Sequence, residues 1–192
     1  AFVSILEVNP YIDKVWAMEE SLDEVLATMH GEDYDYIIDL HRNLRSGLTK
    51  RKLNGGMSFT LKKYNFEKWL LVNFGIDRMP DMHIVDRYLD TVKPFTLEDD
   101  GAGLDYFIPE GTIVNLKRFG LKENRYVAWV VGAAHPGKRF SAAKVTSVLN
   151  QLKRPIVLLG GKADQGLAQE VMAKVSGHVV DFTGRTSLHE SA

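Results

Sequence analysis

The feature that most constrains the fold is an alternation of apolar runs and helical patterns in the last third of the chain. Short apolar runs at 126–131, 155–159 and 178–181 are typical of strands, and helical patterns at 141–152 and 165–175 separate them. Two β-loop-α units in succession predict a parallel sheet, because parallel strands need a long crossover connection. The first run has no polar alternation, so we expect a strand that is covered on both faces.

The first half of the chain shows a second α/β pattern. Ser21 with Glu24 three residues later is typical of a helix start, and we expect that helix to continue to Gly31. The other elements expected before residue 110 are strands at 14–18, 36–40 and 104–108, a helix at 65–74 that places Trp69 near a core, and a helix from 81 that Pro94 terminates.

Composition sets the broad class. The 192 residues suffice for one ordinary domain or two small ones, and 45% apolar with 26% charged residues is typical of a globular protein. There is no cysteine, which excludes disulfides and thiolate chemistry. The chain opens on an apolar segment without an initiator Met and stops just after a helix start, so we expect a fragment of a longer protein.

The loop after the first C-terminal strand is a candidate anion site. Small residues end the strand, and Lys138 and Arg139 follow before Ser141 begins the next helix. Ligands of open α/β sheets bind outside the carboxyl ends of the strands, so two cations at this position favour a phosphate-bearing ligand. His135 has no evident partner in the sequence, and we assign it no acid–base role.

Two further loops follow strands of the same expected sheet. In one, Gly160 and Gly161 allow close approach of a ligand, and Asp164 either accepts hydrogen bonds from a ribose diol or caps the following helix. In the other, Thr183 and Gly184 offer backbone contacts or form a tight turn before a capped helix. A cation, a diol acceptor and backbone groups at one sheet edge together suit a nucleoside diphosphate.

Several enzyme classes lack their motifs here. The sequence contains no Walker A loop, no G-x-G-x-x-G and no G-x-S-x-G, so an ATPase, a dinucleotide-dependent dehydrogenase and a serine hydrolase are not supported. Clustered His, Asp and Glu residues at metal-ligand spacing are also missing, so we expect no metal site.

A basic stretch lies between residues 40 and 66, where the chain has no acidic residue. It suits an anionic partner, although a solvated loop around 54–56 is an open alternative. We do not expect nucleic acid as the partner, because few aromatic residues interleave with the charges and the formal net charge is -1. The basic residues of this stretch are Arg42, Arg45, Lys50, Arg51, Lys52, Lys62 and Lys63.

A further basic candidate lies on the helix expected from residue 81. Arg87 falls on a different side of that helix from its apolar stripe, together with His83 and Asp90. It either faces solvent and pairs with one of these two residues, or it lines a ligand cleft.

Five segments carry a family resemblance. VVGAAHPGKRFS, PIVLLGGKADQGLAQEV and DFTGRTSLHESA resemble, in this order, the C-terminal half of glycosyltransferase family 9, the ADP-heptose:lipopolysaccharide heptosyltransferases and relatives. YDYIIDLHRNLRS and HIVDRYLDTV are similar to its N-terminal half. The resemblance implies a GT-B architecture: an acceptor-side Rossmann-like domain at 1–109, a linker at 110–124 and a donor-binding Rossmann-like domain at 125–192, with mostly parallel sheets that are incomplete at both ends.

The resemblance also implies roles for individual residues. Lys138 would neutralise the leaving diphosphate, whereas the Trp-Pro that follows Lys-Arg in the family is Phe140-Ser141 here. A Gly-Asp loop with the expected general base and an Asp-Ser/Thr-Gly-x-x-His block are absent from this sequence. The other implied contacts are Asp164, Gly160 and Gly161 near the ribose, Thr183 and Gly184 near the base, and Arg42, Arg45 and Arg87 near acidic acceptor sugars.

The function expected from this resemblance is an inverting, metal-independent sugar transfer without a cofactor. The donor would be a nucleoside-diphosphate sugar, ADP-linked and heptose-like, and the acceptor an anionic lipopolysaccharide-type glycolipid. The enzyme would be cytoplasmic and peripheral to the inner face of the membrane. A non-catalytic nucleotide-sugar-binding member of the family is the alternative.

Overall fold

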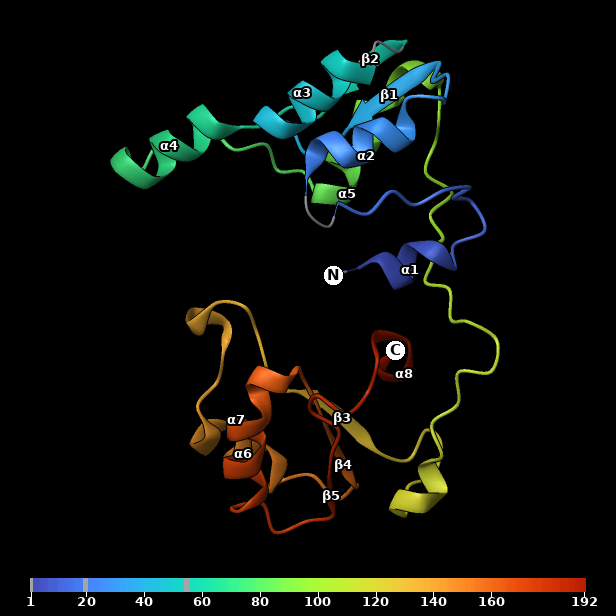
Figure 1. The fold of residues 1–192 in the computed structure, drawn as a ribbon. Helices are drawn as coiled ribbons and strands as arrows, with labels where there is room; N and C mark the ends of the chain where they lie inside the picture. Colours follow the sequence, from blue (N-terminus) through green and yellow to red (C-terminus); the bar gives the residue numbers. More distant parts are fainter. Residues whose placement is uncertain (1, 19–20, 54–55) are drawn as a thin grey trace. The chain divides into compact units, whose positions relative to one another are not determined.

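The computed structural model describes residues 2–18, 21–53 and 56–192. The chain divides into two compact units, which we call unit 1 (residues 1–11 and 106–192) and unit 2 (residues 12–105). Figure 1 shows the elements of both units. The first eleven residues group with the C-terminal part of the chain, whereas the sequence assigned them to the N-terminal domain. In unit 1 the Nε2 atom of His189 lies 3.1 Å from the carbonyl oxygen of Ser4, in helix α1 (Val3–Glu7).

Unit 1 contains the predicted parallel sheet. Its strands β3 (Val127–Val130), β4 (Ile156–Leu159) and β5 (Val179–Asp181) lie in the order β3-β4-β5, and both pairings are parallel. Helix α6 (Ala142–Leu149) connects β3 to β4, and helix α7 (Gln165–Met172) connects β4 to β5. The alternation of apolar runs and helical patterns therefore predicted these elements correctly.

Burial in unit 1 follows from the position of each strand in the sheet. On one face of β4, Ile156 and Leu158 pack with residues of α6 and α7, and on the other face Val157 packs with Leu121 and Phe182. The expectation that β3 is covered on both faces is wrong, because Val130 is 66% exposed. The strand that is covered on both faces is β4. The reason is topological, because among the described strands β3 has a neighbour on one side only.

Unit 2 is built on a smaller parallel sheet. Strand β1 (Tyr36–Asp39) pairs with strand β2 (Met57–Thr60), and helix α3 (Leu44–Leu53) connects the two. Helix α2 (Leu22–Met29) starts as expected, because the hydroxyl oxygen of Ser21 accepts a hydrogen bond from the backbone N–H of Glu24. The sequence did not predict α3 or β2.

The predictions of two strands are wrong, and the predictions of two helices are only partly confirmed. Residues 14–18 and 104–108 form no strand. Helix α4 (Asn65–Phe74) has the expected bounds, but no residue in it is buried, so Trp69 does not lie in a core. Helix α5 (Ile84–Thr91) begins later than expected, after an N-cap at His83. The remaining elements are α8 (Leu188–Ser191) and the 3-10 segments η1 (Lys93–Phe95), η2 (Leu116–Phe119), η3 (Pro136–Lys138) and η4 (Lys162–Asp164).

Among the described residues, no helix combines the length and the apolar character that crossing a membrane requires.

Candidate functional site

The three predicted ligand loops lie together at the carboxyl edge of the unit 1 sheet. They follow β3, β4 and β5, which run parallel. The second and third loops are joined directly, because the backbone N–H of Gly184 donates to the carbonyl oxygen of Gly160 over 2.8 Å. Gly184 has a φ of 64°, and a Cβ there would lie 2.9 Å from the Cα of Lys162, so this turn requires glycine. The three loops therefore share one edge of the sheet, as we expected for loops that follow parallel strands.

Asp164 is largely engaged within the protein. Its Oδ2 atom accepts the backbone N–H of Gly161 over 2.9 Å, and its own N–H donates to the Gly161 carbonyl over 3.0 Å. The carboxylate fills the space beside Gly132, where an added Cβ would lie 2.0 Å from Oδ2. Asp164 stands at the N-cap of α7 but its side chain makes no cap hydrogen bond to that helix, and its carboxylate instead closes the preceding turn at Gly161. The proposed ribose contact stays a prediction.

The two cations of the first loop differ in their surroundings. Arg139 donates from Nε to the carbonyl oxygen of Ala133 over 2.6 Å, and its guanidinium lies 3.8 Å from Oδ1 of Asp164. Arg139 thus connects the first loop to the second. Lys138 is exposed, and within the described residues its ammonium group makes no hydrogen bond and no ion pair. Lys138 is the cation of this loop that is available to a ligand.

The polar groups of Thr183 all make hydrogen bonds within the protein. Its side chain is fully buried, and both its backbone N–H (2.9 Å) and its hydroxyl (2.6 Å) donate to Oδ1 of Asp181. Its carbonyl oxygen accepts a hydrogen bond of 3.1 Å from Nε2 of Gln165. Thr183 therefore shapes the third loop. A contact between this loop and a nucleotide-sugar donor stays a prediction that rests mainly on Gly184.

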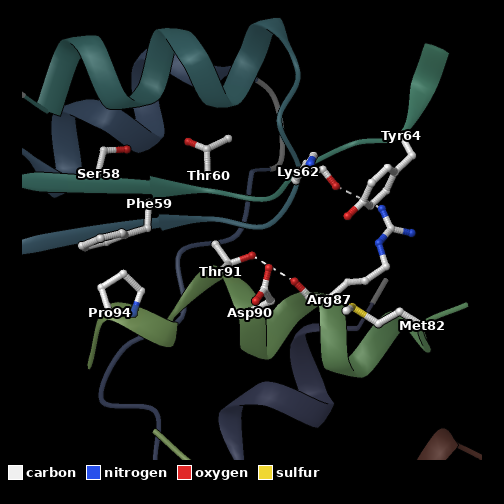
Figure 2. Close-up of a pocket in the computed structure, with 10 residues that line it drawn as sticks. All are labelled: Ser58, Phe59, Thr60, Lys62, Tyr64, Met82, Arg87, Asp90, Thr91 and Pro94. Atoms are coloured by element: carbon white, nitrogen blue, oxygen red, sulfur yellow. Dashed lines mark hydrogen bonds between the residues drawn. The ribbon is translucent and has the colours of Figure 1, made fainter. Parts of the chain in front are cut away.

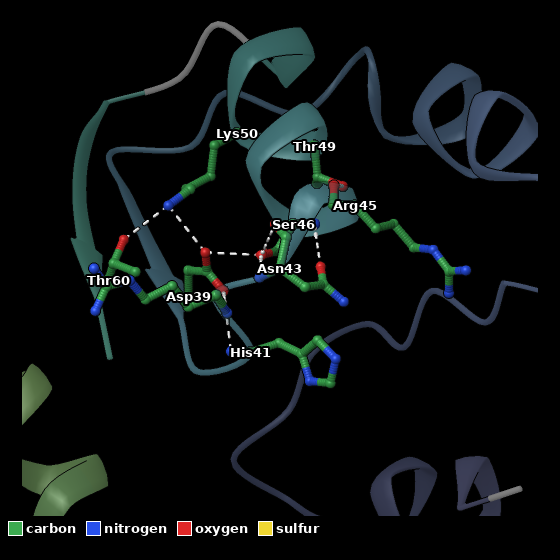
Figure 3. A network of polar contacts seen from close by, with 9 residues as sticks. Asp39, His41, Asn43, Arg45, Ser46, Thr49, Lys50 and Thr60 are labelled. Carbon is green, nitrogen blue, oxygen red and sulfur yellow. Dashed lines mark hydrogen bonds and ion pairs between the residues drawn. The ribbon is translucent and has the colours of Figure 1, made fainter. Parts of the chain in front are cut away.

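Unit 2 contains a polar network around a carboxylate that sequence reasoning did not select. Asp39 ends β1 and is buried, and its Oδ2 lies 2.9 Å from Nζ of Lys50 (Figure 3). The same oxygen accepts the hydroxyl of Ser46 over 2.9 Å. The Oδ1 atom accepts the backbone N–H groups of His41 (3.0 Å) and Arg42 (2.7 Å). Asp39 therefore holds together the end of β1, the following loop and helix α3.

This network sets the acidity of Asp39. Burial by itself raises the pKa of the carboxyl, but the hydrogen bonds from the Arg42 backbone, Lys50, Ser46 and the His41 backbone outweigh it and hold the pKa well below its usual range. A carboxylate that resists protonation and whose oxygens are occupied is a poor general base. The sequence signal for Asp39 was its place at the end of an apolar run, next to a stretch without other acidic residues.

The network also divides the basic stretch into paired and unpaired cations. Lys50 pairs with Asp39 and donates to the hydroxyl of Thr60, and Lys52 pairs with Asp23. These two lysines are less available to an anionic partner than the sequence suggested. The cations without an ion pair in the described part of this stretch are Arg42, Arg45, Arg51, Lys62 and Lys63.

Arg42 and Arg45 differ in backbone geometry but both face solvent. Arg42 has a φ of 44°, in the left-handed region that few residues other than glycine adopt, and the hydrogen bond from its N–H to Asp39 fixes this turn. Arg45, in the first turn of α3, is exposed, and Figure 3 shows its side chain extending away from Asp39. Both guanidinium groups can reach an anionic ligand from the carboxyl end of β1.

Arg87 lines a pocket of about 270 Å³ within unit 2 (Figure 2). It pairs with neither His83 nor Asp90, the two partners considered from the sequence; it donates instead to the carbonyl oxygen of Lys62 over 3.1 Å. Its guanidinium lies 4.9 Å from the ring centre of Tyr64, and its buried Nε atom has no hydrogen-bond partner. Lys62 and Asp90 also line this pocket, so it carries both signs of charge, and contact of Arg87 with an acidic acceptor sugar stays a prediction.

The described residues contain no group of three or more His, Asp or Glu side chains that is placed to hold a metal ion.

Comparison with known proteins agrees with the resemblance drawn from the sequence. The family model for glycosyltransferase family 9 (heptosyltransferase) matches residues 24–192. No curated protein matches the chain. A solved structure of a glycosyl transferase family 9 protein from Veillonella parvula DSM 2008 aligns with a TM-score of 0.76 at 22% sequence identity, over 98% of this chain and 59% of that one. This likeness shows the fold, and the chain spans less than two thirds of that protein's length.

Proposed function

Because the chain belongs to glycosyltransferase family 9, we propose that it is part of an enzyme that transfers a heptose-like sugar. The donor is a nucleoside-diphosphate sugar that is ADP-linked. The acceptor is an anionic glycolipid of the lipopolysaccharide type. The observation that carries the proposal is the arrangement of loops at the carboxyl edge of the unit 1 sheet. Three loops meet there, the Gly184–Gly160 hydrogen bond holds two of them together, and Lys138 supplies an exposed ammonium group.

The proposed step is a displacement at the anomeric carbon. An acceptor hydroxyl attacks this carbon, the bond from carbon to the diphosphate oxygen breaks, and the configuration inverts. The electron pair leaves with the diphosphate, whose charge Lys138 and the N-terminus of α6 stabilise. The hydroxyl proton goes to a carboxylate, which the family resemblance assigns to a Gly-Asp loop that this sequence lacks. Asp39 is unsuited to that role because its oxygens are occupied.

The proposed acceptor side lies on unit 2. Arg42 and Arg45 are exposed cations at the end of β1, and Arg87 lines a pocket of the same unit. Acidic sugars of a glycolipid provide the carboxylates and phosphates that guanidinium groups bind in a bidentate manner. An acceptor of this kind also implies a cytoplasmic enzyme that works at the inner face of the membrane.

The proposal is tested by titrating the full-length protein with ADP- and UDP-linked sugars in a calorimeter, followed by a product assay with anionic glycan acceptors. We expect donor binding and transfer. Tight donor binding without transfer to any anionic acceptor would instead indicate a non-catalytic nucleotide-sugar-binding protein.

Site variants separate the two proposed roles. We expect Lys138→Ala to lower kcat far more than Arg42→Ala, because charge stabilisation of the leaving group acts in the transition state, whereas Arg42→Ala mainly raises the acceptor KM. Lys153→Ala is the matched control, because this exposed lysine precedes β4 at the opposite edge of the sheet. Equal effects of Lys138→Ala and Arg42→Ala on both parameters would refute the assignment.

A further inference from the structure

Helix α4 has an apolar surface that unit 2 does not cover. Its sequence, NFEKWLLVNF, places apolar side chains on nearly all sides of the helix, a pattern that is normally buried. Yet Phe66 is 63%, Trp69 51% and Phe74 62% exposed. Figure 1 shows α4 extending away from the sheet and the other helices of its unit. A surface of this composition indicates a binding partner.

The aromatic side chains of α4 form one continuous cluster. The rings of Phe66 and Trp69 are stacked with centres 6.0 Å apart, and those of Trp69 and Phe74 meet edge to face at 5.2 Å. Gly75, with a φ of 68°, ends the helix directly after this cluster. Trp and Phe are the side chains that interfacial helices insert at the boundary of headgroups and acyl chains.

The charges around α4 indicate the partner's chemistry. Lys62 and Lys63 precede the helix, Lys68 lies within it and Arg78 follows it, and none of the four makes an ion pair within the described residues. The same segment holds two carboxylates, Glu67 and Asp77, so positive charge remains in excess. Lys62 also lies over the ring of Tyr64, 5.2 Å from its centre. An apolar aromatic surface bordered by unpaired cations is complementary to a bilayer that contains anionic lipids.

We propose that α4 is a membrane-docking helix, which inserts its aromatic cluster into the interface of an anionic bilayer while the neighbouring lysines contact lipid phosphates. The proposal rests on the proposed function in one respect, since an acceptor held in a membrane requires the enzyme to reach that surface. Docking through α4 would hold unit 2, with its exposed arginines, at the membrane surface.

The test is co-sedimentation of the full-length protein with vesicles of phosphatidylcholine, with and without phosphatidylglycerol. We expect binding to the anionic vesicles and a loss of about fivefold in affinity for each lysine neutralised in Lys63→Gln and Lys68→Gln. Trp69→Ser combined with Phe74→Ser should abolish binding. The matched control is Leu97→Ser, which removes another exposed apolar side chain of unit 2, 63% exposed, and should leave binding unchanged.

A spectroscopic readout locates the contact. In a variant that carries Trp16→Phe and Trp129→Phe, the remaining Trp69 should shift its emission to the blue when anionic vesicles are added. No vesicle binding, no shift, or equal loss in the Leu97→Ser control would overturn the proposal. So would a wild-type dimer that Trp69→Ser converts to a monomer in sedimentation, because α4 would then be an interface between two copies of the chain.

Failure of this inference can be told apart from failure of the proposed function. Transfer to an acceptor glycan stripped of its acyl chains needs no membrane. The variant with Trp69→Ser and Phe74→Ser should therefore keep that soluble activity while losing vesicle binding. Absence of any transfer by the wild type would count against the proposed function alone.

Discussion

Replacing Asp39 by Asn tests whether the buried carboxylate network holds unit 2 together. The Asp39 side chain is 3% exposed and the paired Lys50 side chain is 22% exposed. Breaking a buried ion pair by removing one partner costs about 3–5 kcal/mol. Asparagine keeps one oxygen that can accept the backbone N–H groups of His41 and Arg42, and Lys50 retains some contact with water. We therefore expect the free energy of unfolding to fall by about 3 kcal/mol, the lower end of this range.

Urea unfolding monitored by tryptophan fluorescence measures this loss. In a Trp129→Phe background the remaining signal comes from Trp16 and Trp69, which both belong to unit 2. The midpoint should fall while the dependence on urea stays unchanged, since the substitution alters stability and not the surface exposed on unfolding.

Asp23→Asn is the matched control for this experiment. Asp23 pairs with Lys52 at the surface, where its side chain is 78% exposed, so its replacement should change the stability by about 0.5 kcal/mol or less. If Asp39→Asn costs no more than Asp23→Asn, the reasoning about the network is refuted.

Two further predictions concern pH and packing. The stability difference between wild type and Asp39→Asn should be full above a pH of about 4 and shrink below it. The reason is that the Asp39 pKa is lowered in the folded state, so that the unfolded chain takes up the proton first as the pH falls. Acid unfolding titrations of both proteins check this, and a stability difference that grows towards low pH would contradict it. Gly132→Ala should destabilise unit 1 by about 1–3 kcal/mol, since its Cβ would lie 2.0 Å from Oδ2 of Asp164. Gly166→Ala in α7, where no atom lies within 4 Å of the added Cβ, should stabilise by about 0.5–1 kcal/mol. Thermal unfolding by circular dichroism should therefore move the two glycine variants in opposite directions.

Local signals made much of the fold predictable. The hydroxyls of Ser21, Ser141 and Ser187 each accept a backbone N–H three residues later, so the helix starts could be recognised from residue type and spacing. Strands β4 and β5 could be predicted from the composition and length of their apolar runs alone. These features depend on neighbours in sequence, which is why they were predicted correctly.

Helix α3 was missed because its sequence, LRSGLTKRKL, has no apolar periodicity. Contacts at its start and beyond its own turns hold it in place. Asn43 and Ser46 exchange hydrogen bonds between side chain and backbone at its start, and Lys50 reaches Asp39 and the hydroxyl of Thr60 at the end of β2. The same missing periodicity concealed the carboxylate network, since nothing in sequence spacing connects Asp39 to Thr60.

The sequence by itself determined the α/β alternation, the three loops that follow the strands of unit 1 and the family to which the chain belongs. Only the tertiary structure decided which charges are available to a ligand. It pairs Lys50 with Asp39 and Arg139 with Asp164, and it leaves Lys138 unpaired among the described residues. The physical reason is that charge pairing and burial depend on distances between segments far apart in sequence, whereas strand and helix formation depends largely on local pattern.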